Sequence, residues 1–272
     1  MTGGPRVADL YTVTNLRLSL ADMTAKPLFG AAPGIEILKG LSFTIPKGTV
    51  VGIVGGSGSG KSTLGRALVR LLEPSDGAIR FDGTDITHLS ESALRPMRRR
   101  FQMIFQDPMS ALNPRHRVST IISEPLRLHA LDAIPDRTAR ALDHVGLPQH
   151  FATRYPHELS GGQRQRVGIA RAIALEPDFI LADEIVSGLD VSSQAQVLNL
   201  LEKLVADLGL TLAFISHDLS VIRRLCQRTI VLYHGGIVED RPTADLFADP
   251  QAAYTRDLLD AIPLPDPAQV WT

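Results

Sequence analysis

Cysteine is almost absent from this 272-residue chain, and neither sign of charge dominates it. The single cysteine, Cys226, excludes an internal disulfide and any cysteine-rich metal or iron–sulfur site built by this chain alone. With 28 Lys and Arg against 29 Asp and Glu, the formal net charge is -1, so we expect no strong field for a polyanion such as nucleic acid. These absences favour a reducing compartment and partners other than nucleic acid.

The chain also lacks a hydrophobic run long enough to span a membrane. Its longest apolar runs, such as residues 50–54, have the length of a strand, whereas a membrane-spanning helix needs about 18 or more apolar residues. The first 20 residues contain neither a basic start nor a continuous apolar stretch, so we expect no secretory signal. At 44% hydrophobic and 21% charged, the composition is that of a globular protein, which we expect in the cytoplasm.

Short apolar runs alternate with helical patterns along the chain. The runs have the length of buried strands and occupy residues 50–54, 101–105, 179–182, 211–215 and 229–233. Over residues 191–208, leucine and valine recur at spacings of three and four, and Gly209 follows at the position of a left-handed C-cap. This alternation predicts an α/β fold in which helices cover a parallel sheet.

A glycine-rich loop at residues 55–63 is the strongest motif. Its sequence, Gly55-Gly56-Ser57-Gly58-Ser59-Gly60-Lys61-Ser62-Thr63, matches G-x-x-x-x-G-K-[ST] between a predicted strand and a predicted helix. Backbone N–H groups of such a loop surround a phosphate, while Lys61 adds a positive charge and Ser62 offers a hydroxyl to Mg²⁺. A flexible Gly-Ser linker would not need the flanking strand and helix. The sequence lacks an Asn-Lys-x-Asp guanine motif, which argues against GTP.

Two acidic residues, Asp183 and Glu184, follow the apolar run at 179–182. In a parallel sheet with a nucleotide at the carboxyl ends of the strands, both would emerge beside the phosphates. There Asp183 would hold Mg²⁺, and Glu184 would take the proton of an attacking water. His217 follows the run at 211–215 and is predicted at the same sheet edge, although a lone histidine there is more often an ordinary surface residue.

A second helix start suited to an anion lies at Leu159-Ser160-Gly161-Gly162-Gln163. Ser160 is a good N-cap, and the glycines open the helix toward a ligand. One nucleotide hardly needs two phosphate-binding helix ends, so we expect this one to serve the nucleotide of a partner subunit. The alternative is an ordinary capped helix with a glycine-rich start.

Together these motifs resemble the ATP-binding subunits of ABC transporters over nearly the whole chain. On this resemblance residues 55–63 correspond to Walker A, Gln106 to the Q-loop, residues 159–163 to the signature, Asp183 and Glu184 to Walker B with its catalytic base, Asp190 to the D-loop and His217 to the switch histidine. The resemblance implies ATP and Mg²⁺ as ligands, with Ser62, Gln106 and Asp183 at the metal and Glu184, His217 and Lys61 in catalysis.

The implied fold is a P-loop NTPase (RecA-like) core with an antiparallel β subdomain and an inserted helical subdomain. Residues 107–158 fit the insertion, because they show helical patterns at 118–129 and 137–146 without clear strands. We therefore divide the chain into residues 1–106 (β subdomain and phosphate-loop part of the core), 107–158 (helical subdomain), 159–241 (signature, acidic pair and histidine) and 242–272 (a tail with short helices predicted at 243–248 and 254–261).

The resemblance also implies a head-to-tail dimer, in which each ATP lies between one subunit's phosphate loop and the other's Ser160-Gly161-Gly162-Gln163. The stretch after residue 231, including Tyr254-Thr255, resembles the oligopeptide, dipeptide and nickel uptake subgroup, although Ala252-Ala253 replaces the usual His-Pro. This implies an importer ATPase at the cytoplasmic face of the bacterial inner membrane. Its implied partners are a second ATPase, preferably a paralogue, two permease subunits and an extracytoplasmic solute-binding protein. The sequence leaves open which solute is transported, and whether the ATPase dimer consists of two copies of this chain or of this chain and a paralogue.

The chain departs from the family after Walker B and at the adenine contact. Ile185-Val186 stands where Pro-Thr is usual, with an effect on turnover whose direction is open. The aromatic residue that stacks on adenine is missing from residues 17–20, and Phe29 or Tyr11 are the candidate substitutes. One alternative is a soluble ABC ATPase without a permease, for which the basic run 98–100 is the only supporting feature. The other, suggested by Ile185-Val186, is a subunit that binds ATP with little hydrolysis.

Overall fold

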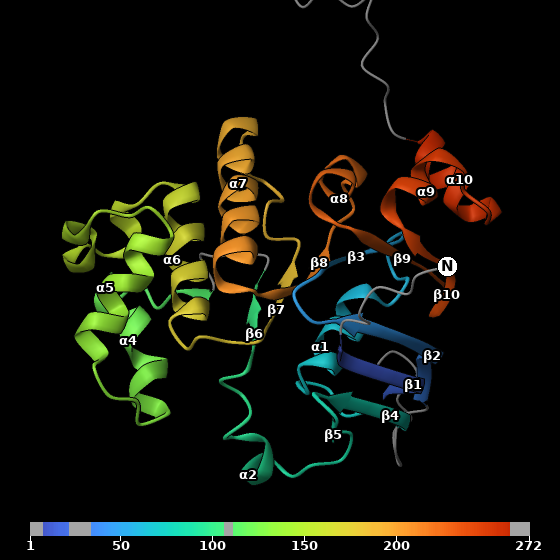
Figure 1. Ribbon diagram of the computed structural model, residues 1–272, viewed down its shortest axis with the longest axis horizontal. Coiled ribbons are helices and arrows are strands. Elements are labelled where there is room, and N and C mark those ends of the chain that lie inside the picture. The colour runs from blue at the N-terminus through green and yellow to red at the C-terminus, as the bar shows by residue number, and fades with distance from the viewer. Residues whose placement is uncertain (1–7, 22–33, 106–110, 262–272) are drawn as a thin grey trace, which may run out of the picture.

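The computed structural model describes residues 8–21, 34–105 and 111–261, and within this part the strands form two sheets (Figure 1). The antiparallel sheet has the order β2-β1-β4-β5 and comprises β1 (Asp9–Ala21), β2 (Gly34–Pro46), β4 (Asp76–Phe81) and β5 (Thr84–Asp85). The other sheet has the order β10-β9-β3-β8-β7-β6 and comprises β3 (Val50–Val54), β6 (Phe101–Ile104), β7 (Phe179–Asp183), β8 (Thr211–Ile215), β9 (Arg228–Tyr233) and β10 (Gly236–Pro242). Its strands β9, β3, β8, β7 and β6 run parallel, and β10 joins β9 antiparallel.

The strands of the parallel sheet are apolar on both faces because each face is covered by a different layer. In β8, Leu212 and Phe214 belong to the core shared with the helices, whereas Ala213 and Ile215 belong to the core shared with the antiparallel sheet. Successive side chains of a strand point to opposite faces, so a strand buried on both sides is a continuous apolar run. All five residues of β8 are buried accordingly.

Helices cover the two faces of the parallel sheet unequally. Figure 1 shows α7 and α8 on one side and α1 with strands β1, β2 and β4 on the other. The helices are α1 (Lys61–Leu68), α2 (Glu91–Leu94), α4 (Val118–Leu128), α5 (Ile134–His144), α6 (Gly161–Ile173), α7 (Val191–Leu208), α8 (Leu219–Leu225), α9 (Thr243–Ala248) and α10 (Ala253–Asp260), with 3-10 turns at Gln149–Thr153 and Pro156–Glu158. Within the described residues, no helix combines the length and apolar character that crossing a membrane requires.

A helical group stands beside the parallel sheet. Helix α4 packs against α5 and α6, and the buried side chains Ile122, Leu126 and Leu142 fill the space between them. Helix α6 also contacts α7 and β6, so it links this group to the sheet. The division of the chain at residues 106, 158 and 241 stays a prediction.

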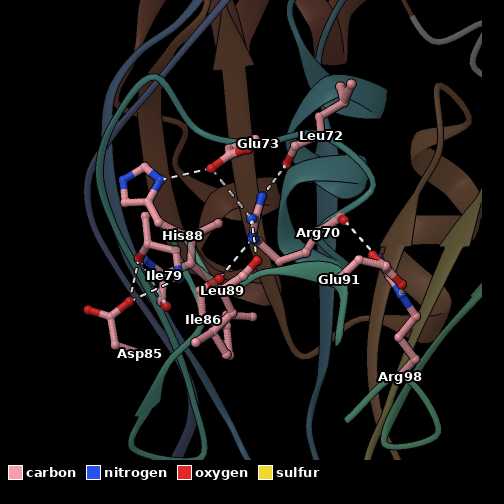
Figure 2. A network of polar contacts seen from close by, with 11 residues as sticks. Arg70, Leu72, Glu73, Ile79, Asp85, Ile86, His88, Leu89, Glu91 and Arg98 are labelled. Atoms are coloured by element: carbon pink, nitrogen blue, oxygen red, sulfur yellow. Dashed lines mark hydrogen bonds and ion pairs between the residues drawn. The ribbon is translucent and has the colours of Figure 1, made fainter. Parts of the chain in front are cut away.

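A buried arginine ties the end of α1 to the antiparallel sheet (Figure 2). Arg70 is 7% exposed and donates to the carbonyl oxygens of Ile86, Leu72 and Leu89. Its backbone is left-handed, with φ +52°, and the chain turns there from α1 toward β4. Arg98 bonds the carbonyl oxygens of Val69 and Arg70 while its guanidinium pairs with Glu91. The helix that follows the phosphate loop is thereby fixed at its far end.

The elements expected from the sequence are largely present. The five apolar runs are β3, β6, β7, β8 and β9, and the helices predicted at 118–129, 137–146, 191–208, 243–248 and 254–261 correspond to α4, α5, α7, α9 and α10. Gly209 is the left-handed C-cap of α7, with φ +63°. Residues 17–20 belong to β1, whose limits and partners were not predicted residue by residue.

Candidate functional site

The glycine-rich loop connects β3 to α1 and has the backbone shape of a phosphate cradle. Gly60 is the N-cap of α1 with φ +100°, and its carbonyl accepts the first helical bond from the Leu64 N–H at 2.8 Å. Gly55 has φ +151°, and a Cβ there would meet the carbonyl oxygen of Leu232 at 2.2 Å. Side chains are excluded at both positions, so the loop can turn tightly into the positive end of a helix.

Lys61, the first residue of α1, folds back over this loop. Its Nζ donates to the carbonyl oxygens of Gly55 and Gly56, each at 2.8 Å, and the residue is 8% exposed. Burial lowers the pKa of Lys61, while the negative charges of Glu184 and Asp183 act in the opposite direction. The ammonium therefore lies at the loop's opening, where it can meet a phosphate oxygen.

Asp183 ends β7 next to the hydroxyl of Ser62. The Ser62 Oγ donates to the Asp183 Oδ1 at 3.2 Å, and Asp183 is 5% exposed. Burial raises the pKa of the Asp183 carboxyl, while the Ser62 hydrogen bond lowers it. Within the described residues, no group of three or more His, Cys, Asp and Glu could hold a metal ion. One carboxylate and one hydroxyl oxygen beside a phosphate cradle are the donor set typical of Mg²⁺, which takes its other ligands from phosphate and water. The residues present fit that ion.

Glu184 and His217 follow neighbouring strands and meet at the same sheet edge. The His217 Nδ1 lies 3.4 Å from the Glu184 Oε1, with side chains 64% and 21% exposed. Glu184 has a left-handed backbone with φ +50°, and its N–H donates to the carbonyl of Ile215 at the end of β8. Seven other non-glycine residues of the described part, Arg70 among them, also have a positive φ, so it is the contact with His217 that marks Glu184 as a site residue.

These residues converge on one open cavity of about 460 Å³. Its lining includes all of residues 55–63 together with Glu184, His217 and Leu258. Leu258 lies on α10 and was not predicted, because nothing in its sequence context points to a distant loop. The cavity offers backbone N–H groups, a buried ammonium and a carboxylate–histidine pair, which is a set suited to binding a polyphosphate and activating water.

The signature segment forms a capped helix start away from this cavity. The Ser160 Oγ accepts from the Gln163 N–H at 3.3 Å, and the Gln163 Oε1 accepts from the Ser160 N–H at 3.0 Å. Gly161 and Gly162 form the first turn of α6, and a Cβ on Gly162 would lie 3.3 Å from the Ser193 Oγ of α7. Among the described residues that line the cavity, none comes from 159–163. The assignment of this helix end to the nucleotide of another subunit stays a prediction.

Asp190 is the N-cap of α7, and its two carboxylate oxygens accept from the backbone N–H and the hydroxyl of Ser193. These bonds hold the pKa of Asp190 below its usual value. Asp190 is likewise absent from the described residues that line the cavity. Gln106 and Phe29 lie outside the described residues.

Tyr11 was wrongly considered as an adenine contact. It is 0% exposed, its hydroxyl donates to the Leu68 carbonyl at 3.1 Å, and its ring packs on Phe81 and Phe179. Tyr11 is a core residue under α1 because its strand belongs to the antiparallel sheet, and no ligand can reach its ring there. Burial accordingly raises its pKa well above the usual value.

Comparison with known proteins gives consistent results. The family model described as ABC transporter matches residues 38–187. A putative peptide import ATP-binding protein of Brucella ovis is 55% identical over 236 residues, which cover 86% of this chain and 74% of that protein. The oligopeptide transport ATP-binding protein OppF of Bacillus subtilis is 49% identical over 238 residues, with 86% and 78% covered.

Solved structures share the fold. A part of the ABC transporter complex cbiONQ from Clostridium perfringens has a TM-score of 0.78 at 29% identity, over 89% of this chain and 91% of that one. A dimeric ATP-binding cassette in a post-hydrolysis state, bound to ADP and Pi, has a TM-score of 0.74 at 30% identity, over 86% and 98%. Because the family model matches more than half of this chain, the chain belongs to the ATP-binding proteins of the ABC transporter family, and it is an ATPase.

Proposed function

We propose that this ATPase drives the uptake of peptides across a bacterial inner membrane, on whose cytoplasmic face it sits with partner subunits. The observation that carries the ATPase part is that Lys61 and Glu184 line the phosphate-loop cavity, while Asp183 bonds the hydroxyl of Ser62 in the same lining. Relatives in Brucella ovis and Bacillus subtilis, named for peptide import and oligopeptide transport, support the peptide cargo. A relative in Salmonella paratyphi A is named for glutathione import, and glutathione is itself a small peptide.

In the proposed reaction, backbone N–H groups of residues 55–63 hold the phosphates, except that of Gly56, which donates to the Tyr254 hydroxyl. The Lys61 ammonium offsets the charge of the phosphates. The Glu184 carboxylate accepts a proton from water while the water oxygen bonds to the γ-phosphorus and the bond to the bridging oxygen breaks, giving ADP and phosphate. His217, whose Nδ1 lies 3.4 Å from the Glu184 Oε1, orients this carboxylate. Ser62, Asp183 and Gln106 would hold Mg²⁺, which supplies positive charge to the phosphate oxygens.

The Glu184→Gln variant tests this assignment. Because an amide cannot take the proton from water, we expect ATP hydrolysis by the assembled complex to fall about 10²- to 10⁴-fold while ATP still binds. The matched control is Glu202→Gln, which removes an acid of α7 that pairs with Arg224. Turnover of Glu184→Gln within about twofold of the parent protein would contradict the role of general base.

We assign the other helix end, Ser160-Gly161-Gly162-Gln163, to the nucleotide of a second ATPase subunit, either a copy of this chain or a paralogue. Its placement outside the cavity of its own chain supports this assignment. The dimeric form of the related cassette bound to ADP and Pi is consistent with it. Each ATP would then lie between a phosphate loop and the partner's α6, and Asp190 would act near that interface.

We place permease docking at a groove of about 480 Å³ between β6 and α4. Leu71, Phe105 and Leu128 contribute to its lining, and they are 50%, 42% and 64% exposed. The groove adjoins the end of β6, directly before Gln106, so a permease segment seated there would sense the nucleotide site. An extracytoplasmic solute-binding protein would deliver the cargo to the permeases.

Leu128→Glu tests the docking groove. A carboxylate in place of the most exposed of the three leucine and phenylalanine side chains should reduce transport-stimulated ATP hydrolysis, while ATP binding by the isolated chain is unchanged. Leu208→Glu, at an exposed leucine of α7 outside the groove, is the matched control. Normal coupling in Leu128→Glu would place the permease contact elsewhere.

A further inference from the structure

The C-terminal helix α10 reaches across the chain to the phosphate loop. The Tyr254 hydroxyl oxygen accepts a hydrogen bond from the Gly56 N–H at 2.7 Å, between residues 198 positions apart. One turn further along the helix, Leu258 lines the nucleotide cavity. A helix of the tail therefore supplies both a polar contact to the loop and a wall of the cavity, and the reaction described above uses neither.

Tyr254 is held in place from two sides. Glu239 of β10 is 6% exposed, and its two carboxylate oxygens accept from the backbone N–H groups of Gln251 and Ala252, each at 3.0 Å. These N–H groups lie directly before α10, so the buried acid fixes the start of the helix. The Tyr254 ring also packs on Tyr233 at the end of β9, with centroids 4.1 Å apart. The hydroxyl is thus presented to the loop by a supported side chain.

Gly56 is matched to this tyrosine. A Cβ at position 56 would lie 2.9 Å from the Tyr254 hydroxyl oxygen, closer than real Cβ contacts come. The φ of Gly56 lies outside the left-handed region, in contrast to Gly55, Gly58 and Gly60. The backbone at position 56 would therefore accept alanine, and the tyrosine hydroxyl is what opposes it. The Tyr254 hydroxyl thus leaves no room for a side chain at position 56, and a side chain there would displace the hydroxyl.

We infer that Tyr254 is a positioning residue of the ATP site, which holds the start of the phosphate loop in its nucleotide-binding shape and so couples the tail helix to nucleotide affinity. A loop already ordered before binding loses less conformational freedom when ATP arrives, so affinity rises without any new contact to the nucleotide. Tyr254 acts through Gly56 and not on the reacting atoms. This inference rests on the proposed assignment of residues 55–63 as the ATP site.

Tyr254→Phe removes the hydroxyl and keeps the ring. We expect the dissociation constants of Mg-ATP and Mg-ADP, measured by calorimetry on the full chain, to rise about 2- to 10-fold, the value of one net hydrogen bond. In the assembled complex KM should rise by the same factor and kcat should stay the same. Tyr233→Phe is the matched control, since it removes a neighbouring hydroxyl with no hydrogen bond to the residues that the structure describes.

A double-mutant cycle with Gly56→Ala gives the sharper test. Gly56→Ala alone should weaken ATP binding, because its methyl group displaces the Tyr254 hydroxyl. In the Gly56→Ala/Tyr254→Phe double variant the methyl group has room, so its dissociation constant should equal that of Tyr254→Phe alone. Two effects that simply multiply would show that the residues are not coupled.

The outcomes separate this inference from the proposed site. Lys61→Ala should weaken ATP binding strongly, and if it does not, the assignment of the loop as the ATP site fails. If Lys61→Ala weakens binding and Tyr254→Phe leaves both nucleotide affinities unchanged, only the inference about Tyr254 is overturned. A lower melting temperature for Tyr254→Phe with unchanged affinities would likewise overturn it, because the tyrosine would then serve stability alone.

Discussion

Arg70 is a single buried charge on which the position of α1 depends. Its guanidinium donates to the carbonyl oxygens of three residues that lie outside the helices and strands. Burial lowers the pKa of Arg70, while the neighbouring Glu73 counteracts this. Those carbonyls would lose their donors if the side chain were replaced by an apolar one of similar length. The arginine therefore contributes through hydrogen bonding more than through its ion pair, whose closest atoms are 3.9 Å apart.

We predict that Arg70→Met lowers the free energy of unfolding by about 2–4 kcal/mol, the cost of leaving buried carbonyl groups without partners. Urea denaturation of the full chain measures this. Arg80→Met, at an exposed arginine of β4, should change stability by less than about 0.5 kcal/mol. Equal stabilities of the two variants would show that water replaces the guanidinium at no cost.

Burial of Cys226 keeps its thiol protonated. The residue follows α8 and is 5% exposed, and burial raises the pKa of its thiol far above the usual value. Only the thiolate reacts with alkylating agents. We predict that iodoacetamide at pH 8 leaves the folded chain unmodified and labels it fully in guanidinium, as read by mass spectrometry. Labelling of the folded protein at the unfolded rate would contradict this.

At the scale of elements, the anchoring of α10 depends on the ionised form of Glu239. Burial by itself would raise the pKa of its carboxyl, but hydrogen bonds, foremost those from the backbone N–H groups of Gln251 and Ala252, together lower it below the usual 4.5. A lowered folded-state pKa contributes stability that is present above the unfolded value and is lost as the pH falls through the folded one. The anchor should therefore hold at neutral pH and weaken in acid below about 4.5.

We predict that Glu239→Gln destabilises the chain by about 1–3 kcal/mol at pH 7, because an amide offers one acceptor oxygen where two N–H groups need one each. The difference from the parent protein should shrink as the pH falls below about 4.5, where the parent loses its own anchor. Urea denaturation of both proteins between pH 3 and pH 7 measures this. A difference that is constant across this range would show that charge at Glu239 plays no part.

Strands that are buried on both faces were predictable from the sequence. Strands whose alternation of buried and exposed residues is interrupted by register shifts were not. Strands β3, β7 and β8 are continuous apolar runs because helices cover one face and a second sheet the other. Strands β1 and β2 are long, but register shifts such as those between Val13 and Leu16 interrupt their alternation. The sequence therefore showed the parallel sheet directly, and the antiparallel sheet only through resemblance to a family.

The same distinction holds for the site. The loop, the acidic pair and the histidine were predictable because strand ends of a parallel sheet meet at one edge. The bond between Gly56 and Tyr254 spans 198 positions and depends on how β10 and α10 fold back, so no local pattern reveals it. Tyr11 was misassigned for a similar reason, because its side of β1 was unknown.

At the scale of the whole molecule, the two helix ends that we assign to phosphate binding are separate. The α1 end opens into the cavity of its own chain, and the α6 end, capped by Ser160 and Gln163, lies outside that cavity. If the α6 end serves a partner's nucleotide, one chain can bind ATP by itself but two chains are needed to complete the hydrolytic site. Hydrolysis then requires residues of this chain that its own ATP binding does not need.

Ser160→Arg separates these two dependences. Because residue 160 lies outside the chain's own cavity, we predict that the isolated variant binds ATP with a dissociation constant within about twofold of the parent protein, as measured by calorimetry. In the assembled complex the bulky side chain would displace the α6 helix end from the partner's phosphates, and ATP hydrolysis should fall about 10²-fold or more. Weaker ATP binding by the isolated variant would mean that α6 acts on its own chain's nucleotide, and normal hydrolysis in the complex would mean that it contacts none. Either result would require a different geometry for the ATP-bound dimer.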